Sequence, residues 1–432
     1  MAIRSFYVSW DHAVRDGDRL LENLARWTNL NAIELTNYDS DWGPTYKEVG
    51  SLVFPSDAPF KGLGLHLTTK ERFATLQRFM ESARSKGFDV VCNFTPLYAN
   101  SKKFVPMACV DLTGAIVPGH NNLHAYGCPN NPDVVKYGQA MIRETMATWT
   151  SADLIAVNHV EFPFWANSSL HENFACFCDS CKARANVRGL DLTAVRRDVK
   201  TLYDSIAAGP TEGSVPRPLS PSDVLNYLVK HPNIGLWLDF RMQSMSEYIS
   251  AVVKAGREAA KEHKRKVRIG LEFLPPTVSD VVGTDFASLY GMFDWISPKL
   301  VPEYLTASVI PRVVEYATKS EATDHPLLMS AIRQLFALGA APPSYRKMSD
   351  QTEGLTYSNT FDPSSIDNQM RYLTPLVGKV DIHPYTWIHH QDPAALKKKL
   401  EKFRSYGLDG YFIWGWEHNL SEAALRKARK AF

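Results

Sequence analysis

The feature that most constrains the fold is a repeated alternation of short β-rich runs with segments of helical periodicity along the 432 residues. A strand, a helix and a second strand in succession form a crossover unit, which makes the two strands parallel. No Gly-x-Gly-x-x-Gly turn follows an early strand, which disfavours an open, doubly wound dinucleotide-binding sheet. We therefore predict an α/β protein of the (β/α)8 or TIM-barrel class, with long loop insertions.

The candidate strands are short, rich in β-branched or aromatic residues, and separated by helical patterns. They are Phe6–Val8, Ala32–Leu35, Asp89–Phe94, Leu154–Val157, Val267–Leu271, Trp295–Ile296, Leu327–Ile332, Val380–His383 and Tyr411–Trp414. A barrel of this class has eight strand positions, so either Leu327–Ile332 or Val380–His383 is expected to be a loop strand, and periodicity does not choose between them. Amphipathic helices are expected at about Pro393–Ser405 and Ser421–Ala431.

Residues 1–432 are expected to form one catalytic domain, because a barrel with loop insertions reaches this length as a single unit. Two segments are longer than a connection between a strand and a helix requires, at about 163–232 and about 335–363. Long loops on a compact barrel are usually functional.

The composition excludes several classes of partner. The chain carries 48 basic and 46 acidic residues, and no long run of one sign could follow a phosphate backbone, so a nucleic acid is not expected to bind. No apolar run approaches the roughly 20 residues that cross a bilayer, so we predict no membrane association. The first strand begins almost at Met1, which leaves no room for a signal peptide and predicts a cytoplasmic protein. Whether the chain forms a homo-oligomer stays open.

Three cysteines gather in one short segment, Phe-Ala-Cys-Phe-Cys-Asp-Ser-Cys, as Cys176, Cys178 and Cys181. In a reducing compartment, such spacing favours a metal site over disulfides, and four thiolates are typical of structural zinc. We predict Cys128, within Gly-Cys-Pro-Asn-Asn-Pro, as the fourth ligand. Cys109, an aspartate or His171 are the alternatives. A closed site with four protein ligands leaves no position for water, so the Zn²⁺ would stabilise the loop.

The position of these cysteines carries a family resemblance. One cysteine, then Cys-x-Cys-x-x-Cys about fifty residues later, just after a fourth strand that leads to Glu161, resembles the zinc-binding barrel of family 42 β-galactosidases. The pattern also resembles uncharacterised glycosidase-like barrels with a Cys-Pro-Asn-Asn-Pro segment. The resemblance covers about Cys128 to Arg241 and implies a zinc-containing barrel that cleaves glycosides, with Glu161 as the acid/base residue.

The catalytic segment departs from that family in two ways. The family has an Asn directly before the glutamate of the fourth strand, whereas this chain reads Asn-His-Val-Glu. The family nucleophile is a glutamate at the end of the seventh strand, and neither candidate for that strand ends in one. The resemblance therefore does not extend to β-galactosidase specificity.

Glycoside cleavage needs two carboxyl groups, one to protonate the leaving oxygen and one to attack the sugar or activate water. Glu161 and Glu272 each follow or end a strongly apolar strand, and these two strands are consecutive major strands of the predicted barrel. Neighbouring Phe162 and Phe273 are expected to desolvate the carboxyls and raise at least one pKa. Glu417 shares the second catalytic role with Glu272, and Asp11 is held in reserve.

Loops at the carboxyl ends of barrel strands build the active site, so polar and aromatic side chains at those points are expected to bind the substrate. Tryptophan faces suit the apolar faces of sugars, and cationic side chains suit the carboxylate of an acidic sugar. The predicted substrate-binding residues are Trp10, Asp11, Asn158, His159, Lys299, Arg333, His383, Trp414 and Trp416.

The leading function is a glycoside hydrolase that acts through paired carboxylates on a carbohydrate substrate. One alternative is a lyase or isomerase of uronic or keto sugars on the same barrel, with His159, His383 or Lys299 as the base. The other is a barrel that binds carbohydrate without catalysis, in which the carboxylates form rim salt bridges.

Overall fold

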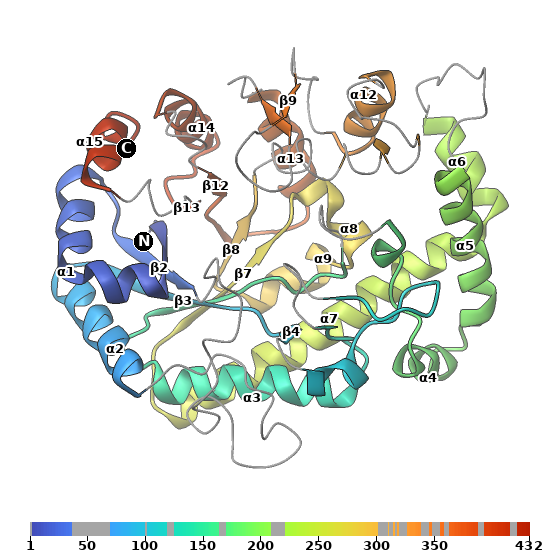
Figure 1. The fold of residues 1–432 in the computed structure, drawn as a ribbon, viewed down its shortest axis with the longest axis horizontal. Coiled ribbons are helices and arrows are strands. Elements are labelled where there is room, and N and C mark those ends of the chain that lie inside the picture. Colours follow the sequence, from blue (N-terminus) through green and yellow to red (C-terminus); the bar gives the residue numbers. More distant parts are fainter. Residues whose placement is uncertain are drawn as a thin grey trace.

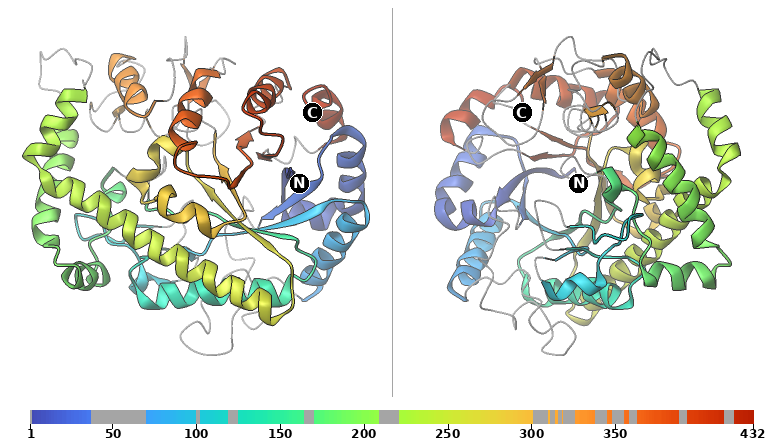
Figure 2. Two further views of the ribbon diagram at one scale, coloured as in Figure 1. Left: turned by 180° about the vertical axis from the view of Figure 1, so that it is seen from behind. Right: turned by 45° about the vertical axis from the view of Figure 1, so that its right-hand side comes forward.

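In the computed structural model, helices surround a central group of strands (Figure 1). It describes residues 2–36, 70–99, 102–118, 125–163, 170–208, 221–300, 310, 314–315, 318, 326–337, 345–347, 355–357, 363–387, 393–414 and 421–432. The two further views show the same arrangement, with the long helix α7 outside the strands (Figure 2).

The central sheet is parallel throughout, with the order β11-β8-β7-β6-β3-β2-β1-β13-β12. Its strands are β1 (Arg4–Ser9), β2 (Ala32–Thr36), β3 (Asp89–Phe94), β6 (Leu154–Val157), β7 (Arg268–Phe273), β8 (Trp295–Pro298), β11 (Asp381–Ile382), β12 (Tyr385–Trp387) and β13 (Tyr411–Trp414). The first strand pairs with both β2 and the last strand, β13, so the two ends of the chain meet in one sheet.

One segment closes the sheet into a barrel. β11 and β12 flank Pro384 in a single stretch, which pairs with β8 on one side and with β13 on the other. A further bridge joins Lys299, just past β8, to Tyr385 of β12. Nine strands thus occupy eight positions, which confirms the predicted (β/α)8 class.

The choice between the two candidates for the seventh position is thereby decided. Val380–His383 overlaps β11 and belongs to the barrel. Leu327–Ile332 is not a strand but lies within the helix α12 (Pro326–Leu335). The physical reason is local, because proline at the first helical position and the leucine, methionine and alanine that follow favour a helix.

Large aromatic side chains fill the inside of the barrel below the carboxyl ends of its strands. The indole of Trp295 stacks on Phe412, with 5.0 Å between ring centroids, and Phe412 stacks on Tyr385 at 6.5 Å. They pack with apolar residues of the other strands, including Ala32, Val91, Leu154 and Ala156. Gly270 leaves the space for the indole, because an added Cβ there would lie 2.0 Å from the ring.

The helices form the outer layer and bury a second, larger apolar core against the strands. Their bounds are α1 (Trp10–Trp27), α2 (Lys70–Ser85), α3 (Pro132–Thr148), α4 (Asp179–Val187), α5 (Leu192–Ala208), α6 (Pro221–Lys230), α7 (Pro232–Glu262), α8 (Ser279–Val282), α9 (Phe286–Leu289), α12 (Pro326–Leu335), α13 (Pro363–Leu373), α14 (Pro393–Ser405) and α15 (Glu422–Ala428). The helices predicted near the C-terminus correspond to α14 and α15.

Helices α3 and α7 pack unusually closely. A Cβ at Gly138 of α3 would lie 2.4 Å from the hydroxyl of Tyr248, and one at Gly256 of α7 would lie 2.5 Å from Ile142. Each glycine therefore lets the opposite helix approach its backbone. Arg143 and Glu258 join the same two helices by a 2.6 Å ion pair at the surface.

The two predicted insertions contain secondary structure of their own. Between β6 and β7 lie a 3-10 turn at Leu170–Asn173 and the helices α4, α5, α6 and α7. The second insertion includes a short antiparallel pair, β9 (Tyr345–Lys347) with β10 (Leu355–Tyr357). Within the described ranges, no helix combines the length and apolar character needed to cross a membrane.

Candidate functional site

A set of polar side chains occupies the barrel interior above the aromatic residues. Glu34 lies in β2, Asn93 in β3 and Glu272 in β7, while Asn158 and Lys299 directly follow β6 and β8. Val157 is in register with Leu271, so Asn158 and Glu272 share one level of the barrel. All five side chains belong to buried residues. These positions lie towards the carboxyl ends of the strands, where barrel enzymes place their active sites.

Hydrogen bonds connect these residues in a chain, in which each donor group points away from Lys299 and towards the two glutamates. The Lys299 ammonium donates to Asn158 Oδ1 at 2.8 Å, and Asn158 Nδ2 donates to Asn93 Oδ1 at 3.4 Å. Asn93 Nδ2 then donates to Glu34 Oε1 at 2.5 Å and to Glu272 Oε2 at 3.1 Å. The network thus runs from a cation to two carboxyl groups, and it fixes the orientation of both amides.

The two carboxyl groups at the end of this network hold protons unusually tightly. Burial raises the pKa of Glu34 to about 7, against the hydrogen bond from Asn93 and the charge of Lys299, which lower it. Burial, followed by the nearby Glu34 carboxyl, raises the pKa of Glu272 well above its ordinary value. Two carboxyls in one desolvated site disfavour the doubly ionised state, so near neutral pH the pair retains a proton.

Glu161 follows the same strand as Asn158 and forms a second part of the site. His159 Nδ1 lies 3.0 Å from Glu161 Oε1, and the backbone N–H of His159 donates to Asn158 Oδ1 at 2.8 Å. Burial and the charge of Lys299 lower the pKa of His159 well below its ordinary value, so its imidazole is neutral at pH 7. An ionised Glu161 would accept a hydrogen bond from the Nδ1–H tautomer of this ring.

The backbone at this point is unusual. His159 has a φ of 52°, in the left-handed region that a residue with a Cβ rarely adopts. Such conformations are found where the surrounding structure holds them, and they cluster at functional sites. Here the Asn158 side chain caps the His159 N–H and thereby supports the turn that presents Glu161.

The structure brings together five of the predicted site residues: Asn158, His159, Glu161, Glu272 and Lys299 are linked directly or through Asn93. The Trp414 ring contacts Tyr7 edge-on, with 6.1 Å between centroids, and packs against the inner core. Trp416 and Glu417 lie outside the described residues.

The other predicted binding residues lie elsewhere in the fold. Trp10 and Asp11 begin α1, and the buried Trp10 ring packs on Trp149 at 5.0 Å. Arg333 is a buried residue of α12 and does not follow a strand, because the predicted strand before it is helical. His383 lies between β11 and β12 near the Trp295 ring, and burial lowers its pKa to about 4.

Glu34 and Asn93 are the two members of the network that are not among the site residues predicted from the sequence. Most of the predicted residues follow the ends of strands, whereas Glu34 is the third residue of β2 and Asn93 the fifth of β3. The available signal was an isolated acid within Ala-Ile-Glu-Leu, since a carboxylate in an apolar parallel strand is buried and needs a partner.

The predicted metal ligands come together. The ligand atoms of Cys128, Cys176, Cys178 and Cys181 all lie within 4.8 Å of one another. Cys128 Sγ is 3.5 Å from Cys181 Sγ and 3.4 Å from Cys178 Sγ. Tetrahedral zinc with Zn–S bonds of about 2.3 Å separates its sulfurs by about 3.8 Å. The four thiols therefore fit such an ion with small adjustments.

The cysteines come from the loop before α3 and from the segment that leads into the first turn of α4. Cys128 precedes α3, which is capped by the Asn131 side chain, and Cys178 occupies the N-cap of α4. The Val110 N–H donates to Cys176 Sγ at 3.3 Å, and Asn130 Nδ2 donates to Cys181 Sγ at 3.3 Å. N–H donors and a helix N-terminus both stabilise thiolates, the form that binds a metal.

Without a metal, the pKa values of the clustered cysteines shift in different directions. Burial and the neighbouring thiols raise the pKa of Cys128, while the pKa of Cys181 is raised first by contacts with Cys128. Burial opposes ionisation of Cys176 too, but hydrogen bonds from the surrounding thiols outweigh it and lower the pKa of Cys176 well below its ordinary value. A metal ion would displace the remaining protons.

Comparisons with known proteins support the fold. No family model matches the chain, and no curated protein matches its sequence. The glycoside hydrolase domain of PgaB (BpsB) from Bordetella bronchiseptica superposes with a TM-score of 0.55 at 11% identity, covering 99% of both chains. The catalytic domain of β-amylase from Paenibacillus polymyxa gives a TM-score of 0.55 at 10% identity and covers 100% of both chains.

A third similar structure is a β-galactosidase from the psychrophilic Marinomonas ef1, with a TM-score of 0.54 and 12% identity. The match covers 99% of this chain and 59% of the β-galactosidase. At these identities the likeness establishes the barrel fold, and the chemistry has to be argued from the site itself.

Proposed function

We propose that this chain is a glycoside hydrolase, with residues 1–432 as a single catalytic domain. The observation that supports it best is the buried pair Glu34 and Glu272, bridged by Asn93 inside the barrel, with Glu161 just past the adjacent strand β6. Hydrolysis of a glycosidic bond needs a carboxyl group that is protonated at neutral pH and a second that is ionised. The raised pKa of Glu272 suits the first of these roles.

Glu272 is the proposed proton donor. Its raised pKa keeps the carboxyl protonated near neutral pH, which lets it protonate a leaving glycosidic oxygen. Glu161, which the family resemblance implies as the acid/base residue, is instead the proposed second carboxylate, oriented by the neutral imidazole of His159. Glu34 and Asn93 position the proton on Glu272, and Lys299 and Asn158 hold the Asn93 amide in the required orientation.

Hydrolysis of a panel of nitrophenyl glycosides tests the proposal. Glu272→Gln and Glu161→Gln preserve side-chain shape but remove the acid, so each should lower kcat by at least about a hundredfold. Glu258→Gln is the control, because Glu258 is an exposed glutamate of α7 paired with Arg143. A folded Glu272→Gln variant that hydrolyses a substrate of the wild-type protein at the wild-type rate would remove Glu272 from the mechanism.

The cysteine cluster is proposed to hold one structural Zn²⁺. Four thiolates complete a tetrahedral shell, so the ion would join the loops before α3 and α4 and take no part in the chemistry. Metal analysis of the purified protein should find about one zinc per chain. Cys178→Ser should lose it, whereas Cys92→Ser, at a buried cysteine of β3, should retain it. Zinc content unaffected by Cys178→Ser would contradict the assignment.

A second candidate function is elimination or isomerisation of an acidic sugar. It is favoured by the buried Lys299 ammonium, which suits a substrate carboxylate, beside the neutral imidazole of His159, which suits a base. Incubation with uronate oligosaccharides separates the two, since elimination gives an unsaturated product that absorbs in the ultraviolet. Binding of such sugars without any conversion would favour a non-catalytic barrel instead.

A further inference from the structure

Arg241, in the middle of α7, is a fully buried cation with no polar partner in the part of the chain that the structure describes. It is 1% exposed, and none of its three side-chain nitrogens has a hydrogen-bond acceptor among these residues. Its guanidinium lies between the rings of Phe162 and Trp237, 4.6 and 4.4 Å from their centroids. Among the described residues, no carboxylate forms an ion pair with it.

This arrangement is energetically unfavourable unless an anion is present. Burial lowers the pKa of Arg241 to about 9, so the side chain is still charged at neutral pH. Stacking on two rings attracts the cation but does not satisfy its N–H groups, which point outward in the guanidinium plane. A buried charge that persists in a fold normally has an opposite charge beside it.

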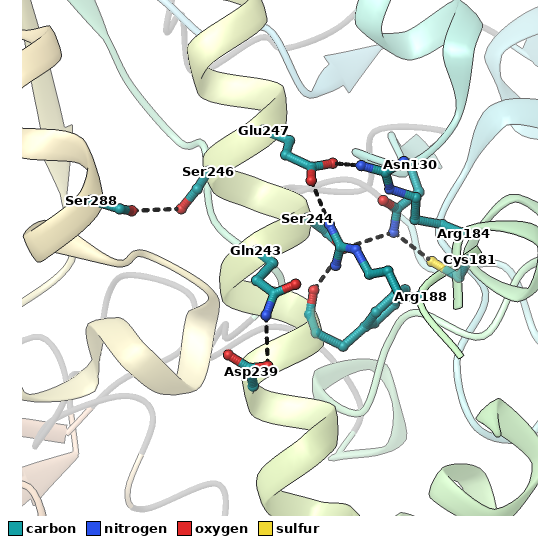
Figure 3. A network of polar contacts seen from close by, with 11 residues as sticks. Asn130, Cys181, Arg184, Arg188, Asp239, Gln243, Ser244, Ser246, Glu247 and Ser288 are labelled. Carbon is teal, nitrogen blue, oxygen red and sulfur yellow. Dashed lines mark hydrogen bonds and ion pairs between the residues drawn. The ribbon is translucent and has the colours of Figure 1, made fainter. Parts of the chain in front are cut away.

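The thiol cluster lies on the same side of α7. Ser244, one helical turn after Arg241, accepts a hydrogen bond from Asn130 Nδ2 at 3.0 Å, and the same amide donates to Cys181 (Figure 3). Glu247, one further turn along α7, accepts hydrogen bonds from Arg184 and Arg188. These contacts join α7 to α4, the helix that carries Cys181. Against the larger effect of burial, the charges of Cys109 and Tyr126, and after them those of Cys176 and Cys181, raise the pKa of Arg241, so the thiol cluster lies within electrostatic reach of the guanidinium.

Metal binding would supply the missing anion. Four thiolates and one divalent ion carry a net charge of −2. The −2 centre would sit in a buried setting, where its own desolvation is costly. Arg241 is the buried cation of α7 on that face.

We propose that Arg241 is the counter-cation of a divalent metal–tetrathiolate centre formed by Cys128, Cys176, Cys178 and Cys181. Its charge stabilises the metal-loaded cluster, and the loaded cluster provides the anion that the guanidinium lacks among the described residues. The inference rests on the proposed metal site but not on the proposed hydrolysis. It predicts that metal affinity depends on the charge of the side chain at position 241, and not only on how that side chain packs.

Zinc affinity, measured by competition with a chromophoric chelator, tests the inference. Arg241→Met keeps an unbranched, apolar side chain between the two rings but removes the charge, and it should weaken zinc binding by at least about tenfold. Arg241→Lys should recover most of that affinity. Arg257→Met is the matched control, because Arg257 is a half-exposed arginine of the same helix, paired with Asp294, and this change should leave affinity unchanged.

The spectrum of the Co²⁺-substituted protein provides a readout that packing alone would not move. A cation near the thiolates lowers the energy of their lone pairs, so Arg241→Met should shift the sulfur-to-cobalt charge-transfer band to longer wavelength. If Arg241→Met does not fold, Arg241→Gln, which is neutral and polar, replaces it in both measurements with the same expected tenfold loss.

Three results would overturn the inference. One is wild-type zinc affinity with an unchanged cobalt band in a folded, neutral variant. Another is equal weakening by Arg241→Lys and Arg241→Met, since charge would then be irrelevant. The third is a wild-type protein that binds neither zinc nor cobalt, which would overturn the metal site as well, and so distinguishes failure of the site from failure of its counter-cation alone.

Discussion

Glu34 and Glu272 accept hydrogen bonds from one and the same nitrogen, Asn93 Nδ2, although β6 and β3 separate their strands in the sheet. The barrel closes enough to bring non-neighbouring strands into contact across its interior. A single amide that donates to both carboxyl groups holds them at a fixed separation. The pH then determines whether the pair carries a proton.

Replacing Glu34 with Gln should shift the pH profile of kcat/KM. The Glu34 carboxyl raises the pKa of Glu272, so a neutral amide in its place lowers that pKa. If Glu272 acts in its protonated form, the alkaline limb should move to lower pH. The profile with the best nitrophenyl glycoside checks this. An alkaline limb that moves to higher pH would contradict the assignment of Glu272 as the acid.

The opposite shift is expected for Lys299→Met. The ammonium of Lys299 lowers the pKa of both Glu34 and Glu272, so its loss should raise both values and move the alkaline limb to higher pH. The variant also loses the hydrogen bond to Asn158 and should be destabilised by about 1–3 kcal/mol. The same kinetic profile, with urea unfolding, measures the two effects separately. A shift in the same direction as that of Glu34→Gln would contradict this account of the network.

Stability should depend on pH through the same pair. A carboxyl whose pKa is higher in the folded state binds its proton more tightly on folding, so its stabilising contribution is complete below about pH 4.5 and is lost as pH rises through about 7. Glu34→Gln removes that loss. Relative to wild type, the variant should be more stable at pH 8 than at pH 5, by on the order of 2 kcal/mol. Urea unfolding at pH 5 and pH 8 measures the free energy of unfolding of both proteins. For the control Glu258→Gln, the difference from wild type should be the same at the two pH values.

Much of the barrel could be predicted because its parallel strands are buried on both faces. Leu154–Val157 and Tyr411–Trp414 read as short apolar runs between polar segments, and both are strands in the structure. Leu327–Ile332 has the same apolar content but is part of a helix. An apolar run of that length does not distinguish a buried strand from a buried helix, whereas Pro326 at the helix start does.

The site was predictable where sequence neighbours are also neighbours in space. Cys176, Cys178 and Cys181 lie within one turn, their chemistry required a fourth ligand, and the predicted fourth residue, Cys128, lies with them in the structure. Glu34 was missed because its partners, Asn93 and Glu272, come from other strands. Its burial and its pairing depend on closure of the barrel, which no local pattern specifies.

The close fit of Trp295 over Gly270 gives a prediction for the barrel core. A Cβ at Gly270 would lie 2.0 Å from the indole, which is fully buried and stacked on Phe412, so the ring cannot move away freely. Gly270→Ala should therefore destabilise the protein by about 1–3 kcal/mol through overpacking. Gly235→Ala is the matched control, because Gly235 is a helical residue of α7 with no atom within 4 Å of its added Cβ. It should be neutral or stabilise by up to about 1 kcal/mol through helix propensity. Urea unfolding of both variants measures the contrast, and equal stability would mean that the indole does not fill the space above Gly270.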